Sequence, residues 1–353
     1  MNPIRRRTKL RRFLIGFGLF CVALIVIVVI MNLLTIFFFS YKRDPNYQGP
    51  RPRPAELLEY YDYPKHFIDA KIDIMGETDN YIHKRVRFLL VTRTQVNLPA
   101  DIYAKEYDIY LDYFENKAEG KFPTIILFPT FGGGDVGLEA RLLADYFVPE
   151  GFNCAIFRGE EIDYDSLMSV DYVEGFLKRA VLDIRQQLDF LQQQDKVDGE
   201  RMGCVGLSLG GIEAVVAAGV DERLKCNVIA LAGGSMADII CYSKEPRIKG
   251  AREKAIKKQN ETLEEIHNNF EINLKTDPIK LAPYVDARNV LMMEAYFDNR
   301  VIPRKYSDKL RDAMGRPEMF YMFTEHFKTP FLYLPYARWR ALHFFKDKFE
   351  MGE

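Results

Sequence analysis

Apolar residues gather in short runs along the middle of the chain, and segments of helical periodicity lie between these runs. A short apolar run bounded by turn residues is typical of a buried strand, and apolar residues that recur every three or four positions are typical of a packed helix. The pattern predicts strands at residues 124–128, 153–157, 202–207, 227–232, 289–297 and 318–323. It predicts helices at residues 136–147, 173–194, 212–218, 307–314 and 336–349.

Strand and helix alternate at the spacing of βα units, which favours an α/β fold with a doubly wound, mostly parallel sheet. Residues 86–92 and 106–114 precede this region and resemble an antiparallel opening hairpin. Residues 236–283 interrupt the alternation with a more polar stretch that contains a charged helix at 251–270. We interpret this stretch as a small helical cap over the site, and an ordinary solvated helical excursion is the alternative.

The run at 202–207 leads into Gly206-Leu-Ser208-Leu-Gly210, which matches the G-x-S-x-G pattern of a nucleophile elbow. In an elbow, a tight strand-to-helix turn lifts the serine hydroxyl above the sheet, and the glycines prevent collisions with the crossing backbone. The helix that follows places the Leu209 N–H and a positive dipole where an oxyanion would form. A glycine-rich turn with a solvated serine is the alternative, but the strand before and the helix after favour the elbow.

A serine hydroxyl needs a base that takes its proton, and the chain has five histidines. His326 follows the strand at 318–323, at the sheet edge where reacting groups gather in such folds. Asp298 ends the preceding strand at the same edge and would orient the imidazole. We therefore expect His326 to be the base and Asp298 the acid. Alternatively, His326 is a polar loop histidine and His343 is the base. The alternative for Asp298 is an aspartate that caps a helix or stabilises a turn.

The order Ser208, Asp298, His326 along the chain is that of the α/β-hydrolase superfamily. From about residue 82 to residue 349 the chain resembles the dienelactone-hydrolase-like and acetyl-esterase-like members of that superfamily. The elbow is the strongest match, and the acid strand and loop at 288–303 are the next. Glu325-His326-Phe is similar to the Gly-His-Tyr/Phe of the family, with glutamate in place of glycine.

The oxyanion loop of that family usually reads His-Gly-(Gly/Phe)-Gly after the third strand, whereas this chain has Pro129-Thr-Phe131-Gly-Gly133. Backbone N–H groups are the donors there, so the missing histidine is not required for the chemistry. The resemblance implies that the N–H groups of Phe131 and Leu209 hold the oxyanion. It implies neither a metal nor an organic cofactor.

The charge balance bears on the partners. The formal net charge of the 353 residues is −1, which argues against nucleic acid as a partner because phosphate binding needs a basic excess. The five cysteines include no C-x-x-C spacing, so neither a zinc site nor a redox pair is indicated.

The N-terminal region predicts a membrane anchor. Residues 1–12 are basic, and residues 13–39 are 27 uncharged residues dominated by Ile, Val, Leu and Phe. About 20 apolar residues suffice to cross a bilayer, and basic residues favour the cytoplasmic side. We expect a retained single-pass signal anchor, a stalk at 40–80 and a hydrolase domain at 81–353 on the non-cytoplasmic side. A cleaved signal peptide is the alternative, which the length of the apolar run weakens.

Two functions of different classes agree with these features. The first is a membrane-anchored serine hydrolase that cleaves a carboxylic ester of a small-molecule or lipid-like acyl substrate through an acyl-enzyme, with an amide, thioester or peptide as other substrates. The second is a non-catalytic α/β-hydrolase-like domain, tethered at the membrane to bind a partner, because a fold does not by itself imply a function.

Overall fold

The computed structural model describes residues 3–63, 70–88, 109–130, 137–259 and 261–352, apart from some side chains of the N-terminal helix and those of Ile109 and Gln259. Within these residues, ten strands form one sheet in the order β1-β10-β9-β8-β7-β5-β6-β4-β3-β2. The strands are β1 (Ser40–Tyr41), β2 (Ala70–Glu77), β3 (Tyr81–Phe88), β4 (Ile109–Asn116), β5 (Phe122–Phe128), β6 (Asn153–Arg158), β7 (Val197–Leu207), β8 (Leu224–Ala230), β9 (Val290–Ala295) and β10 (Glu318–Met322).

The centre of the sheet is parallel and its margins are antiparallel. Strands β6, β5, β7, β8, β9 and β10 run parallel to their neighbours in that order. Strands β3 and β4 pair in antiparallel fashion, as expected for residues 86–92 and 106–114, of which 89–92 and 106–108 lie outside the described residues. Strands β2 and β1 add antiparallel strands at the two edges. The prediction of a mostly parallel α/β sheet is therefore confirmed.

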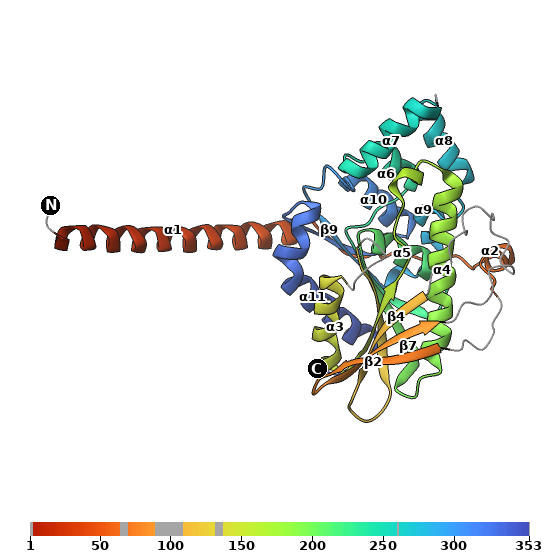
Figure 1. Cartoon of the computed structure of the whole chain (residues 1–353), viewed down its shortest axis with the longest axis horizontal. Coiled ribbons are helices and arrows are strands. Elements are labelled where there is room, and N and C mark those ends of the chain that lie inside the picture. The colour runs from red at the N-terminus through yellow and green to blue at the C-terminus, as the bar shows by residue number, and fades with distance from the viewer. Residues whose placement is uncertain (1–2, 64–69, 89–108, 131–136, 260, 353) are drawn as a thin grey trace.

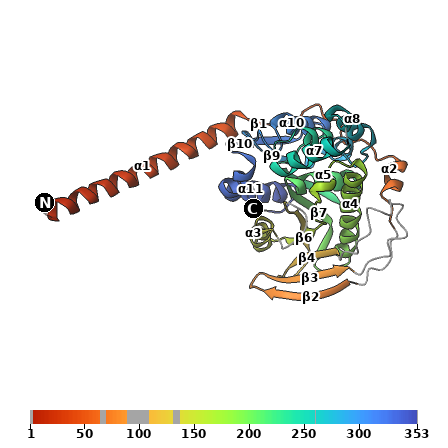
Figure 2. The same ribbon diagram turned by 45° about the horizontal axis from the view of Figure 1, so that its top comes forward.

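Helices cover both faces of the sheet, as Figure 2 shows with α4 and α5 on one side and α3 and α11 on the other. The helices of the domain are α2 (Ala55–Tyr60), α3 (Leu138–Phe147), α4 (Val170–Gln192), α5 (Leu209–Val220), α6 (Met236–Tyr242), α7 (Pro246–Gln259), α8 (Leu263–Asn273), α9 (Pro278–Leu281), α10 (Arg304–Ala313) and α11 (Thr329–Lys348). Two apolar cores result, one under α4, α5 and α10 and one under α3 and α11. Residues of β5 and β7 contribute to both because successive side chains point to opposite faces.

The inserted segment at 236–283 is helical and forms α6 to α9, which gather at one end of the domain (Figure 1). The prediction of a single charged helix at 251–270 is wrong, because the structure has two helices there. Helix α7 ends at Gln259, and Thr262 starts α8 with a capping box in which its hydroxyl and the Glu265 carboxylate bond each other's backbone N–H groups. A capping signature inside a charged run thus divides the helix.

The N-terminal helix α1 (Pro3–Phe38) projects away from the domain (Figure 1). The span expected at 13–39 falls on it, and the side chains of residues 13, 14, 21, 24, 25, 28 and 32 lie outside the described part of the chain. Across the residues that are described, no helix has both the length and the apolar character needed to cross a membrane.

The segment expected to be a stalk lies against the domain over much of its length. Strand β1 pairs with β10, and β2 forms the opposite edge, so the folded unit includes residues before 81. The Arg53 guanidinium donates to the carbonyls of Ala218 and Gly219 at the end of α5, at 2.9 and 2.8 Å. Tyr61 is fully buried, and its hydroxyl lies 2.7 Å from that of Thr276. The sequence does not reveal β2 because seven of its eight residues are exposed.

Candidate active site

The turn between β7 and α5 has the backbone of a nucleophile elbow. Ser208 has φ 58° and ψ −116°, a conformation that L-residues rarely adopt and that active sites often retain. Its N–H donates to the carbonyl of Ala230 at 2.9 Å, which fixes the turn on β8. A Cβ at Gly206 would lie 2.3 Å from the Gly210 carbonyl oxygen, and one at Gly210 would lie 2.3 Å from that of Phe128. The strand and helix can cross this closely only with glycine at both positions.

His326 lies directly beside the serine. It begins a 3-10 turn (His326–Lys328) after β10, and its Nε2 atom is 2.9 Å from the Oγ of Ser208. Its Nδ1 atom is 2.6 Å from the Oδ2 of Asp298. All three side chains are buried. The structure therefore brings together the three residues singled out in the sequence, although they come from three separate loops.

Asp298 is held by backbone N–H groups of the loop that follows it. Its Oδ1 accepts from Arg300 at 3.2 Å and Val301 at 2.9 Å, and its Oδ2 accepts from Ile302 at 3.0 Å. Burial raises the pKa of this carboxyl, but the hydrogen bond and charge of His326 and the backbone donors outweigh burial, so the pKa lies below its usual value. Asp298 is thus an ionised group fixed in position beside the imidazole.

The two expected oxyanion donors differ in what the structure describes. Leu209 is the first residue of α5, so its N–H is among those that a helix leaves without an intrahelical partner. Phe131 lies outside the described residues. Just before it, the N–H and hydroxyl of Thr130 donate to the carboxylate of Glu139 at 3.2 and 2.6 Å, which ties the end of β5 to the first turn of α3.

The other histidines have different surroundings. His83 lies 2.8 Å from buried Asp112, and His267 lies 3.2 Å from Asp238. His343 is exposed, with its Nδ1 atom 2.8 Å from the carbonyl oxygen of Trp339. His66 is outside the described residues. His326 is therefore the histidine that contacts Ser208 in the described part of the chain.

A cavity opens onto Ser208 and His326. Helices α6 and α7 of the inserted segment form part of its wall. Met236, Ile239 and Ile240 reach the cavity from α6. In the sequence this segment is more polar than its neighbours, so these three apolar side chains were not predicted to line the site. Their spacing of three and four positions was the available signal for an apolar helix face.

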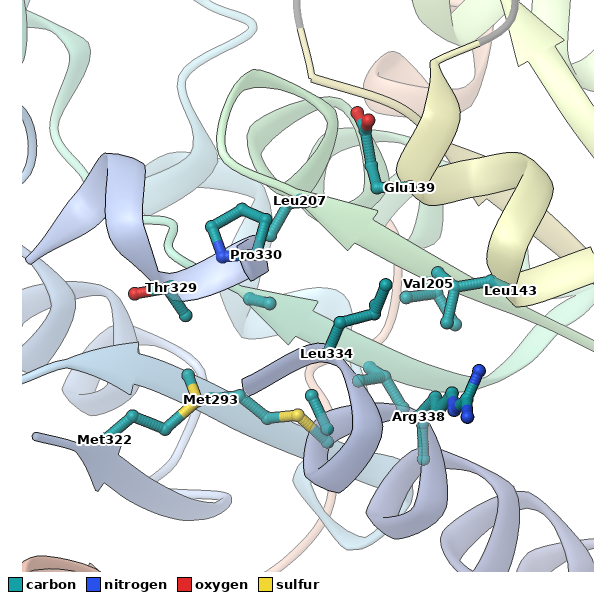
Figure 3. Close-up of a pocket in the computed structure, with 14 residues that line it drawn as sticks. Glu139, Leu143, Val205, Leu207, Met293, Met322, Thr329, Pro330, Leu334 and Arg338 are labelled. Atoms are coloured by element: carbon teal, nitrogen blue, oxygen red, sulfur yellow. The ribbon is translucent and has the colours of Figure 1, made fainter. Parts of the chain in front are cut away.

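A second cavity lies between α3, α11 and strands β7 to β10 (Figure 3). Leu143 and Leu334 reach it from α3 and α11, and Leu207, the residue before Ser208, reaches it from β7. Its lining is apolar except for Glu139, Thr329 and Arg338.

Two buried carboxyl groups near the site were not predicted to have a role. Glu294 of β9 accepts from the Ala232 N–H at 3.2 Å and the Ser307 hydroxyl at 3.1 Å, and burial raises its pKa well above the usual value. Glu213 of α5 is buried, and neither of its carboxyl oxygens has a hydrogen-bond partner among the residues that the structure describes. Burial, with the charge of Asp183, raises the pKa of Glu213 to about 8.

The described residues contain no group of three or more His, Cys, Asp and Glu side chains that could hold a metal ion. The arrangement of Ser208, His326 and Asp298 can perform nucleophilic attack with proton transfer, since it pairs a hydroxyl with a base and the base with an ionised acid.

No family model matches this chain. Two uncharacterized proteins from two strains of Mycobacterium tuberculosis are each 29% identical to it over 172 residues. That stretch covers 49% of this chain and 36% of each relative, so the chain spans about a third of the length of the curated relatives it matches.

Solved structures with a similar fold include several esterases. Acetyl xylan esterase 1 from a Thermoanaerobacterium species superposes with a TM-score of 0.61 at 15% identity, over 81% of this chain and 94% of that one. An acetyl xylan esterase from a Paenibacillus species gives 0.61 at 17% identity, over 84% and 97%. A glucuronoyl esterase from Teredinibacter turnerae gives 0.53 at 13% identity, over 86% and 82%. At this level of identity the likeness shows that the chain has the α/β fold of these esterases.

Proposed function

We propose that this protein is a serine hydrolase that cleaves carboxylic esters, with Ser208 as nucleophile, His326 as general base and acid, and Asp298 as the group that orients His326. The observation that carries the proposal is the continuous path of hydrogen bonds from the Ser208 hydroxyl through the imidazole to the Asp298 carboxylate, at 2.9 and 2.6 Å. The strained backbone at Ser208 supports it further, because it keeps the hydroxyl directed away from the strand and the helix.

The proposed reaction proceeds in two halves. The Ser208 oxygen attacks the ester carbonyl carbon while its proton passes to Nε2 of His326, and the carboxylate of Asp298 stabilises the imidazolium. The tetrahedral intermediate then expels the alcohol, which takes the proton from His326, and an acyl-enzyme remains. Water attacks this acyl group with His326 again as base, and the acid leaves as Ser208 regains its proton.

The negative oxygen of each tetrahedral intermediate needs donors. We assign this role to the backbone N–H groups of Leu209 and Phe131. The first residue of α5 supports the choice of Leu209, because donors fixed at a helix N-terminus need no rearrangement when the charge develops.

A fluorophosphonate probe tests the proposal, because it reacts with a serine whose hydroxyl is activated by a base. We expect the full chain to be labelled and Ser208→Ala to lose both labelling and esterase activity, the latter by at least about 10³-fold. Ser235→Ala is the matched control, since Ser235 is also buried and caps α6. Absence of labelling in folded protein would reject the hydrolase and favour the non-catalytic binding domain.

We also propose that residues 13–39 anchor the protein in a membrane as a single span, with the N-terminus cytoplasmic and the hydrolase domain on the other side. The uncharged sequence of this segment and the basic residues before it support the proposal. In sealed vesicles of known orientation, protease added outside should digest the domain only where its side of the membrane faces out. Release of the full chain from membranes by alkaline carbonate would reject the anchor.

A further inference from the structure

The cavity at Ser208 has an almost entirely apolar lining. Four of its lining residues are polar or carry a polar group, namely Tyr164, Ser208, Glu245 and His326, and all the others are aliphatic residues, Met or Phe. Aliphatic side chains come from the inserted helices and also from the rest of the domain, where Ile212 lies on α5 and Ile302 lies after β9. A bound group would therefore meet mostly hydrocarbon among the described residues.

The charged residue of this lining, Glu245, is already engaged by its own helix. The Glu245 carboxylate accepts from the backbone N–H groups of Arg247 and Ile248 at 2.7 and 2.9 Å, and from Nε of Arg247 at 3.0 Å. It thereby closes the first turn of α7. The Arg247 guanidinium in turn lies over the ring of Tyr164, 4.6 Å from its centroid. Glu245 therefore serves the helix rather than a substrate.

Ser208 and His326 are occupied by the proposed chemistry itself, which leaves the hydroxyl of Tyr164 as a polar group of the lining that could meet a substrate hydroxyl. A sugar ring brings several hydroxyls, and each one buried without a partner opposes binding. A hydrocarbon chain makes no such demand and gains from every methylene that leaves water. The lining thus fits an alkyl or acyl chain better than a carbohydrate.

We infer that this cavity binds an aliphatic group attached directly to the scissile ester, so that the substrates are esters with an aliphatic chain of several carbons and not acetylated sugars. The inference rests on the proposed function and deepens it. It also separates this chain from the acetyl xylan esterases whose fold it shares. The aliphatic chain of the substrate could belong to the acid or to the alcohol of the ester. The two series of esters in the experiment below distinguish these two cases.

Ile248 is the residue that best tests the inference. It lies on α7, lines the cavity and is only half-buried, so its side chain can change size with less risk to folding than the fully buried Ile240. Its backbone N–H, which holds Glu245, remains in any variant. Ile272 is the matched control, an exposed isoleucine on the neighbouring helix α8 that is not part of the cavity lining.

The experiment measures kcat/KM of the full chain for two series of esters, 4-nitrophenyl esters from acetate to decanoate and acetates of primary alcohols from ethanol to decanol. Acetate release from acetylated xylan is measured beside them. We expect kcat/KM to rise by up to about fourfold per methylene over the first few carbons in one series, then to level off. The series that rises identifies the side of the ester that enters the cavity.

The variants then locate the effect. Ile248→Trp should shift the optimum of kcat/KM to shorter chains. Ile248→Ala should leave this optimum in place or shift it to longer chains, and Ile272→Trp should leave the profile unchanged. Labelling of Ser208 by a small fluorophosphonate confirms that each variant is folded. Suppose that the unsubstituted protein is labelled but kcat/KM rises in neither series, or that acetylated xylan is the better substrate. The inference of an aliphatic substrate is then rejected, while the proposed serine hydrolase activity stands. If the parent is not labelled, the proposed function itself fails.

Discussion

The Oδ2 atom of Asp298 accepts hydrogen bonds from both the Nδ1 of His326, at 2.6 Å, and the backbone N–H of Ile302, at 3.0 Å. The same atom that orients the imidazole is thus fixed by the loop that follows β9. Because the backbone sets the position of the carboxylate, the direction of the His326 ring is set as well. The second ring nitrogen, Nε2, then points at the Ser208 hydroxyl.

Asp298→Asn should lower kcat for ester hydrolysis by about 10³- to 10⁴-fold with little change in fold. The amide can keep one backbone contact through its oxygen, but it then presents an N–H₂ group to Nδ1, which favours the tautomer with a proton on Nε2. That tautomer cannot accept the serine proton. Asp286→Asn is the control, because Asp286 accepts backbone and arginine donors in a similar way outside the site. A loss of only a few-fold in Asp298→Asn would contradict the assigned role.

Gly210→Ala should reduce both stability and activity. Its Cβ would lie 2.3 Å from the carbonyl oxygen of Phe128 and 2.5 Å from that of Pro129, so β5 or α5 must move. Such overpacking typically costs about 1–3 kcal/mol, and the shift would displace Ser208. In contrast, Gly250→Ala in α7 meets no atom within 4 Å and should stabilise the helix by roughly 0.5–1 kcal/mol. The free energy of unfolding in urea and kcat/KM are measured for both variants. Equal effects of the two substitutions would contradict the close approach of α5 to β5 at Gly210.

The site could be predicted from the sequence because each of its parts has a local signature. The elbow is a contiguous motif, and Asp298 and His326 each follow an apolar run, so their strands bring them to one edge of the sheet. The cavity could not be predicted because its wall depends on how α6 and α7 turn back over the sheet. The inner strands could be predicted because a buried strand leaves a hydrophobic run in the sequence. Strand β2 could not be predicted because it is an exposed edge strand and has no such run.

Arg53→Met should lower the free energy of unfolding by about 1–3 kcal/mol. The Arg53 guanidinium donates to two carbonyls in the last turn of α5, where a helix lacks internal partners and carries a partial negative charge. Arg51→Met is the control, because among the described contacts Arg51 is held through its backbone N–H to the Pro283 carbonyl. Equal stabilities of the two variants in urea would show that the contacts of Arg53 with α5 do not stabilise the fold.

Glu213→Gln should stabilise the protein at alkaline pH and have little effect in acid. The pKa of Glu213 is raised from 4.5 to about 8 by burial and by the charge of Asp183. Between these two pH values the folded chain holds a proton that the unfolded chain has released, so the contribution of this group to stability is greatest below pH 4.5 and is lost as the pH rises through 8. Glutamine has nearly the same shape and never ionises, so the variant avoids this loss.

The expected gain at pH 9 is on the order of 2–5 kcal/mol, because each unit of pKa shift corresponds to about 1.4 kcal/mol. Urea unfolding of the full chain in detergent, at pH 5 and pH 9, measures it. Glu264→Gln on α8 replaces an exposed carboxylate and should alter neither value appreciably. Within the described part of the chain neither oxygen of Glu213 has a hydrogen-bond partner, so the amide forfeits no bond recorded there for the acid. A Glu213→Gln variant that is destabilised equally at both pH values would show that Glu213 is paired in solution and that its ionisation does not limit stability.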